Sequence, residues 1–107
     1  MTQEYILCAA IWYKFIPLKK ELPPEAMVRP INCDTGLVFC GHRHAHCMYT
    51  MVSITGIRSV ESEVGDYIQG FLTSKNRFVD REEGARIQIA NGHKIDFENR
   101  LFSEDLY

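Results

Sequence analysis

Apolar residues occur along this chain in runs whose spacing predicts both strands and helices. Residues 5–13 are almost continuously apolar and rich in aromatic and β-branched side chains, which predicts a central strand buried on both faces. Residues 37–40 predict a second, short strand between two glycines. Residues 70–79 predict a strand, a tight turn at Lys75-Asn76 and a further strand, because Asn tolerates the positive φ that such turns require.

The segment that follows the second strand predicts an amphipathic helix. No Gly or Pro occurs between His42 and Gly56. Apolar side chains recur there at the i, i+3, i+4 and i+7 positions that form one helical face. These residues are Ala45, Met48, Tyr49 and Val52.

A second helix is predicted after the hairpin. Asp80 is a good N-cap, and Glu83 stands three residues later, as in a capping box. The helix is expected to run to Ala90 and to end at Asn91-Gly92, a typical C-cap.

Together these elements predict an α+β fold: a small antiparallel sheet with two main helices, in a single ligand-binding domain over residues 1–107. Residues 14–30 contain all four prolines and predict a loop. The end of the chain is apolar, and a core this small leaves little room for it, so we expect at least a dimer. The apolar residues of this tail are Leu101, Phe102, Leu106 and Tyr107.

Composition narrows the function classes. The chain has 107 residues, of which 46% are hydrophobic, and a net charge of −2, which argues against a protein that coats a nucleic acid polymer. A compact phosphorylated ligand is still allowed, because two or three cations can hold it. No apolar run approaches the ~20 residues of a membrane span, and the start lacks a signal-peptide pattern. We therefore expect a cytosolic protein whose four cysteines are reduced.

The sequence of residues 40–47, CGHRHAHC, is the first candidate site. His42 and His46 stand four residues apart and could bind one metal ion with a cysteine, but no standard pair of zinc-ligand motifs is present. Alternatively, a glycine before a helix start exposes backbone N–H groups, and Arg43 and His44 add donors for a phosphate. In a third interpretation these side chains only pack in the core or face water. The sequence does not decide between this interpretation and the anion site.

The hairpin is the second candidate site. Thr73, Ser74, Asn76 and Arg77 offer many hydrogen-bond donors, and a flanking Phe71 could stack on a base. The alternative is an ordinary hairpin in which the phenylalanine belongs to the core. Alternation along the strand favours a core position for Phe71 if its neighbour Leu72 is not in the core.

No catalytic arrangement stands out. The common nucleophile, metalloprotease and phosphate-loop motifs are absent, and His42-x-His44 resembles only half of a phosphodiesterase signature. A binding protein is therefore favoured over two alternatives. These are a metal- or histidine-dependent phosphodiesterase acting on a nucleotide, and a zinc-stabilised protein that inhibits a host protein by direct binding.

Three stretches also carry a family resemblance: residues 5–11, residues 38–44 with Cys47, and residues 69–83 with the ending 101–107. They resemble a family of small phage-encoded proteins, identified as the first Thoeris anti-defence family. The resemblance implies a non-enzymatic protein without a cofactor that sequesters a cyclic nucleotide immune signal in the cytoplasm of the infected bacterial host. It also implies a cyclic ADP-ribose isomer as ligand, cyclic oligonucleotides for some members, and dimers assembled into hexamers.

The matching motifs imply a composite ligand site at a protomer interface, with no catalytic or metal-binding residue. His44, a donor in the anion-site interpretation, completes the expected set of ligand-binding residues. This set consists of Arg43, His44, Phe71, Thr73, Ser74, Asn76 and Arg77.

Overall fold

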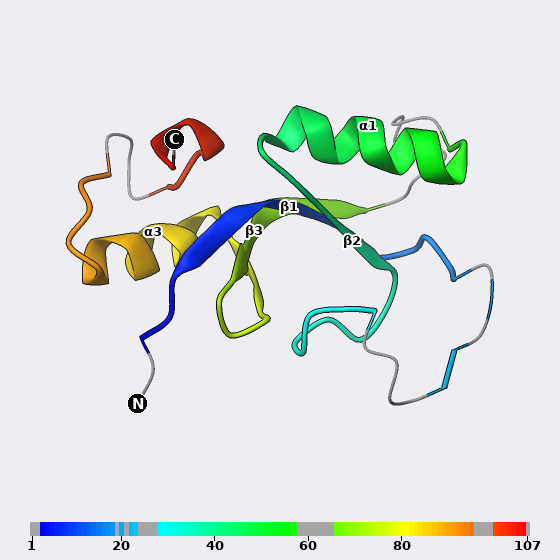
Figure 1. Cartoon of the computed structure of the whole chain (residues 1–107), viewed down its shortest axis with the longest axis horizontal. Coiled ribbons are helices and arrows are strands. Elements are labelled where there is room, and N and C mark those ends of the chain that lie inside the picture. Colours follow the sequence, from blue (N-terminus) through cyan, green and yellow to red (C-terminus); the bar gives the residue numbers. More distant parts are fainter. Residues whose placement is uncertain are drawn as a thin grey trace.

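The sheet is built around the first strand. A computed structural model of the chain describes residues 3–18, 20, 22–23, 28–57, 66–95 and 100–106. Four strands form one antiparallel sheet in the order β2-β1-β3-β4 (Figure 1). Their bounds are β1 Ile6–Tyr13, β2 Leu37–Gly41, β3 Tyr67–Thr73 and β4 Phe78–Asp80. The α+β fold expected from the sequence is therefore confirmed, including the central position of β1.

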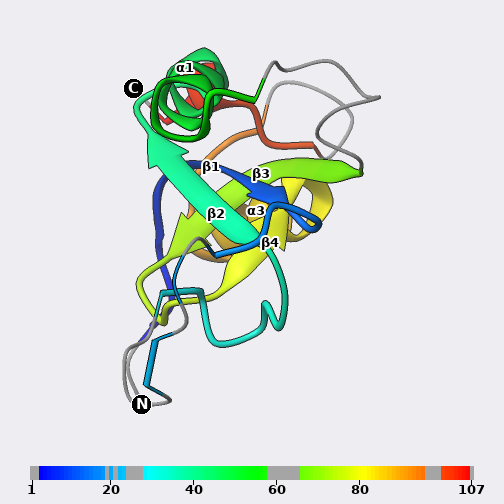
Figure 2. The ribbon, with the colours of Figure 1, turned by 90° about the vertical axis from the view of Figure 1, so that its right-hand side faces the viewer.

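Side chains from both faces of β1 are buried, as its continuous apolar run predicts. Ala9 and Ile11 pack under helix α1 (His44–Thr55), whereas Ala10, on the other face, contacts a cluster that contains Cys33. Helix α3 (Arg81–Ala90) covers β3 and β4 (Figures 1 and 2).

Both helices pack on the same face of the sheet. Phe71, in the core beneath α3, lies directly across from Ala9 on β1 and from Val79 on β4. Directly opposed residues of paired strands point to the same side, so the two helical cores are neighbours along one face. The site described below lies where these two helices and the C-terminal segment meet.

The local signals at the hairpin and at α3 are confirmed. Asn76 has a φ of 57° at the turn between β3 and β4. The Asp80 side chain accepts a hydrogen bond of 2.8 Å from the backbone N–H of Glu83, which is the predicted N-cap. The helix ends at Asn91, and Gly92 follows with a φ of 87°.

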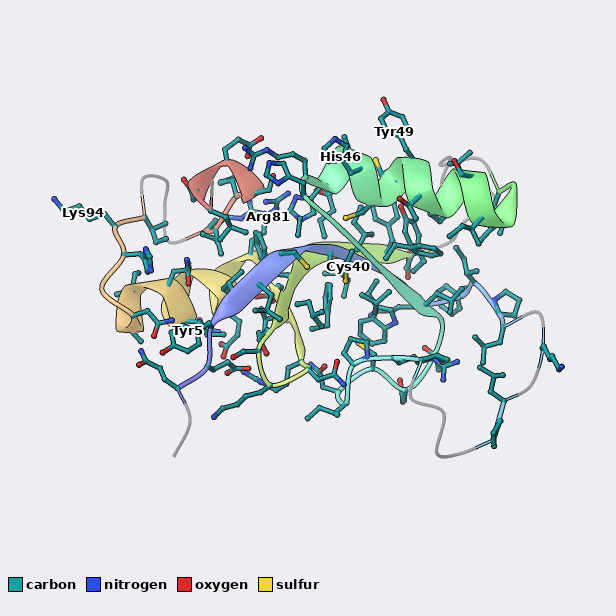
Figure 3. All side chains as sticks on the ribbon, in the orientation of Figure 1. Tyr5, Cys40, His46, Tyr49, Arg81 and Lys94 are labelled. Carbon is teal, nitrogen blue, oxygen red and sulfur yellow. The ribbon has the colours of Figure 1, made fainter. Side chains whose placement is uncertain are left out.

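The predicted buried face of α1 is wrong in part. Ala45 is exposed, and Tyr49 is 70% exposed and points away from the sheet (Figure 3). His44, Cys47 and Met51 are the buried residues instead. Apolar side chains occur all around this helix, so their spacing does not determine which face meets the sheet.

The expectation about the C-terminal tail is corrected. Leu101 is fully buried in the core under α3, and Leu106 packs against the same cluster. Gly84 makes the space, since a Cβ there would lie 3.2 Å from a methyl carbon of Leu101. The tail therefore docks on its own chain and gives no argument for a dimer, although oligomerisation stays a prediction. Tyr107 lies outside the described residues.

We expect Leu101→Ala to lower the free energy of unfolding by about 2–5 kcal/mol, because it removes a fully buried side chain and leaves a cavity. Urea denaturation followed by circular dichroism measures this change. Ile54→Ala is the matched control at a side chain that is 62% exposed, and it should change stability by less than ~0.5 kcal/mol. Equal costs for the two variants would contradict the docking of the tail.

Candidate functional site

A polar cleft of about 650 Å³ opens where β3 and α3 begin and where the C-terminal segment approaches them. Among the described residues, two guanidinium groups, three carboxylates and Tyr67 line it. The lining residues are Asp66, Tyr67, Ile68, Gln69, Asp80, Arg81, Glu82 and Arg100.

Arg81 is the most constrained side chain of this cleft. Its Nη1 donates to the carbonyl of Leu101 at 3.0 Å, and its Nη2 donates to the amide oxygen of Gln69 at 2.7 Å. The guanidinium carbon lies 4.6 Å from the centre of the Phe102 ring. The backbone N–H of Leu101 in turn donates to the carbonyl of Arg81 at 2.9 Å. Arg81 and the C-terminal segment thus fix each other (Figure 3).

The contacts of Arg81 are all with neutral groups. Within the described part of the chain, no carboxylate lies within ion-pair distance of its guanidinium. Burial and the nearby charge of Arg100 lower the pKa of Arg81, and Glu104 opposes them. The group nevertheless remains protonated. A half-buried cation that forms no ion pair with a described residue keeps donors with which it can bind an anion in the cleft beside it.

His44 lies behind Arg81 and is almost fully buried. Its Nε2 is 2.8 Å from the carbonyl oxygen of Gly70, and its Nδ1 is 3.4 Å from Nη2 of Arg81. The edge of the ring packs on Phe71, with the ring centres 5.3 Å apart. Burial, the largest effect, lowers the pKa of His44. The expected site residue is therefore next to the cleft but does not line it.

Arg43 lies at the same end of α1. Its backbone N–H donates to Nδ1 of His46 at 3.2 Å, and its Nη1 donates to the carbonyl of Ser103. The first half of the expected site, Arg43 and His44, thus gathers around the C-terminal segment, close to Arg81.

The second half of the expected site holds the N-terminal segment. Arg77 forms a bidentate ion pair with Glu4, with contacts of 2.8 and 2.9 Å. Thr73 is buried, and its hydroxyl donates to the same carboxylate at 2.6 Å. A phosphate at Arg77 would have to displace this carboxylate.

The remaining hairpin residues differ in their surroundings. Phe71 is fully buried in the core, as the plain interpretation of the hairpin predicts. The hydroxyl oxygen of Ser74 accepts from the backbone N–H of Tyr5 at 2.9 Å, and Asn76 is exposed at the turn. The turn and the start of α1 lie on opposite sides of the sheet (Figures 1 and 2). Within one chain Phe71 packs on His44, but the turn residues Ser74 and Asn76 do not lie beside the start of α1, so a site that combines the turn with Arg43 requires a second protomer.

The Cys/His segment is dispersed in the fold. Cys47 is buried, and its thiol donates to the carbonyls of Ala9 and Arg43, whereas Cys40 is exposed and contacts the thiol of Cys8. All four cysteines are free thiols. Among the described residues no three His, Cys, Asp or Glu side chains are close enough to hold one metal ion.

The sequence interpretation missed Arg81 and Gln69. A signal was present at Arg81, because a cation in the first turn of a helix faces the positive end of the dipole and is unfavourable there. A residue placed against that preference needs another reason for its position. Gln69 offered no comparable signal.

The Glu4–Arg77 pair predicts a dependence of stability on acid pH. The hydrogen bond from Arg77 lowers the pKa of Glu4 from 4.5 to about 2. The unfolded chain takes up this proton at a higher pH than the folded chain, so the free energy of unfolding falls as pH falls from 4.5 to about 2. Arg77→Gln should be less stable than the parent near neutral pH, and the difference should vanish near pH 2.

Urea denaturation at a series of pH values tests this expectation. Lys94→Gln, at an exposed position, is the control and should not alter the pH dependence. A stability difference between Arg77→Gln and the parent that stays constant across the acid range would contradict the assigned pair.

Comparison with known proteins indicates that this chain is a phage protein. A protein-family model described as Phage T4 y16D protein matches residues 5–107, whereas no curated protein and no solved structure matches. Within the described residues, no helix has the length and apolar character needed to cross a membrane. The expected phage origin is confirmed, and the description of the family does not mention anti-defence activity. Because the match covers nearly the whole chain, this protein belongs to the Phage T4 y16D protein family.

Proposed function

We propose that this phage protein binds a cyclic nucleotide immune signal and sequesters it without cleaving it. The expected ligands are a cyclic ADP-ribose isomer and cyclic oligonucleotides, met in the cytoplasm of the infected host. The observation that carries the proposal is the half-buried Arg81, which has only neutral hydrogen-bond partners among the described residues and lines an open cleft.

A phosphate is the anion that suits this site. The guanidinium group matches the oxygens of a phosphate better than an ammonium group does, and its charged hydrogen bonds are roughly twice as strong as neutral ones. Arg100 lines the same cleft and adds a second positive charge. The volume of about 650 Å³ falls in the range of small-ligand sites.

The other lining groups suit the rest of a nucleotide. Asp66 and Glu82 have no ion-pair partner among the described residues, so their carboxylates can accept hydrogen bonds from ribose hydroxyls or base amino groups. Tyr67 also lines the cleft, but its ring packs on Tyr13 beside the core under α1, with the ring centres 5.6 Å apart. Because the carboxylates and arginines of the described lining form no ion pairs with each other, they favour a ligand that carries both anionic groups and hydrogen-bond donors.

Retention without cleavage is part of the proposal, and the fate of the ligand tests it. The described lining residues include no Cys, Ser or His, so a cleavage reaction here would have to use the carboxylates or Tyr67. The neighbouring His44 has both ring nitrogens engaged, by Gly70 and by Arg81. In a homo-oligomer, the exposed Asn76 of a second protomer would be available to complete the site.

Arg81→Gln is expected to weaken binding of cyclic ADP-ribose and of its isomers by about ten- to a hundred-fold, the cost of one charged hydrogen bond. Arg100→Gln, at an exposed side chain, should weaken binding less and flatten its salt dependence. Isothermal titration at two salt concentrations measures both effects. Arg86→Gln is the control, because that exposed arginine pairs with Glu83 away from the cleft.

The fate of the ligand separates the function classes. Heat denaturation of the complex followed by mass spectrometry should recover the cyclic nucleotide intact. Loss of the ligand with time would instead support a phosphodiesterase. If no cyclic nucleotide binds, the proposal is rejected, and a protein that acts by binding a host protein becomes the better candidate.

A further inference from the structure

His44 is a buried polar residue whose ring connects the sheet to the cleft arginine. Its side chain fills the space between Gly70 of β3, Phe71 of β3 and the guanidinium of Arg81 at the start of α3. The residue itself is 8% exposed and does not line the cleft. An apolar side chain could fill this space equally well. The polar contacts of the ring with Gly70 and Arg81 therefore need an explanation.

The partners of the ring determine its tautomer. The carbonyl of Gly70 can only accept, so Nε2 of His44 must carry the proton that it donates over 2.8 Å. In the neutral ring, Nδ1 then has a free lone pair, and it faces Nη2 of Arg81 at 3.4 Å. The neutral imidazole is therefore an acceptor for the guanidinium.

A second proton on the ring would reverse this interaction. Nδ1 would become a donor that faces another donor, and two cations would be in contact in a partly buried site. This repulsion would also weaken the hydrogen bond from Nη2 of Arg81 to Gln69. Protonation of His44 thus disfavours the position in which Arg81 lines the cleft.

The charged groups around His44 act in opposite directions. Arg81 from α3 disfavours the protonated ring, whereas Glu104, from the short 3₁₀ helix η1 (Ser103–Asp105), favours it. His46 and Cys47 are the titratable neighbours on its own helix, and Arg43 is the N-cap residue before it. The β3 residues that His44 contacts carry no charge. Burial is the largest effect and, with Arg81, it outweighs the hydrogen bond to the Gly70 carbonyl and the charge of Glu104, so the pKa of His44 is lowered.

We infer that His44 is a positioning residue that holds Arg81 in the cleft while its ring is neutral and releases it when the ring takes up a proton. The effect on ligand affinity rests on the function proposed above. The coupling between the two side chains does not, and it can be measured without a ligand.

Nuclear magnetic resonance of the ligand-free protein tests the coupling. As the pH is lowered from about 8 through the midpoint of the His44 ring, which burial moves below 6.5, the Nε–Hε signal of Arg81 should move with that same midpoint. His93→Gln, which removes an exposed histidine, should leave this titration unchanged, and His44→Gln should abolish it. An Arg81 signal that stays fixed while the His44 ring titrates overturns the inference, and this measurement needs only the parent protein.

Titration with cyclic ADP-ribose extends the test to binding. Affinity of the parent should fall by up to about tenfold per pH unit below the pKa of His44, and His44→Gln should bind with little pH dependence. Unchanged affinity of the parent across this range, with weaker binding by Arg81→Gln, overturns the positioning role and leaves the proposed function intact. If no cyclic nucleotide binds at any pH, the proposed function fails, and the resonance titration alone decides the role of His44.

Discussion

The guanidinium of Arg81 joins three parts of the chain that are far apart in the sequence. It binds Gln69 on β3, faces His44 on α1 and donates to the carbonyl of Leu101 in the C-terminal segment. Desolvation of a cation is costly, and neutral acceptors offset only part of that cost. The interactions that close the fold at this corner therefore hold one guanidinium group beside an open cleft, with no ion pair to any described residue.

Arg77 and Arg81 show how differently two arginines of one short segment can be used. Arg77 is paired with Glu4, and this ion pair, with Thr73, fixes the N-terminal segment against the hairpin. Arg81 has a similar role for the C-terminal segment but acts through carbonyl and amide oxygens. A ligand phosphate at Arg77 must compete with a carboxylate, whereas at Arg81 it meets no such competitor among the described residues. This difference favours the cleft over the hairpin as the first site of contact.

Local patterns in the sequence predicted the strands, the turn at Asn76 and the ends of α3, because each depends on neighbouring residues only. The buried face of α1 was not predicted, since apolar residues surround that helix. The docking of Leu101 was missed for a different reason. It depends on the absence of a side chain at Gly84, seventeen residues earlier in the chain, and on a core that only the folded sheet creates.

The candidate site likewise contains features that local sequence predicts and features that only the folded chain creates. The sequence predicted a site at Arg43 and His44, which lie near Arg81, but contacts among residues 44, 69, 81 and 101 have no local pattern from which they could be inferred. The number of N–H donors on Arg81 then explains how one side chain can stabilise the fold and also bind a ligand. A guanidinium has five N–H donors, and the contacts with Leu101, Gln69 and His44 use three of them. Arg81 can therefore bind an anion while it keeps the C-terminal segment in place, so occupation of the cleft does not require any of the interactions that stabilise the fold to break.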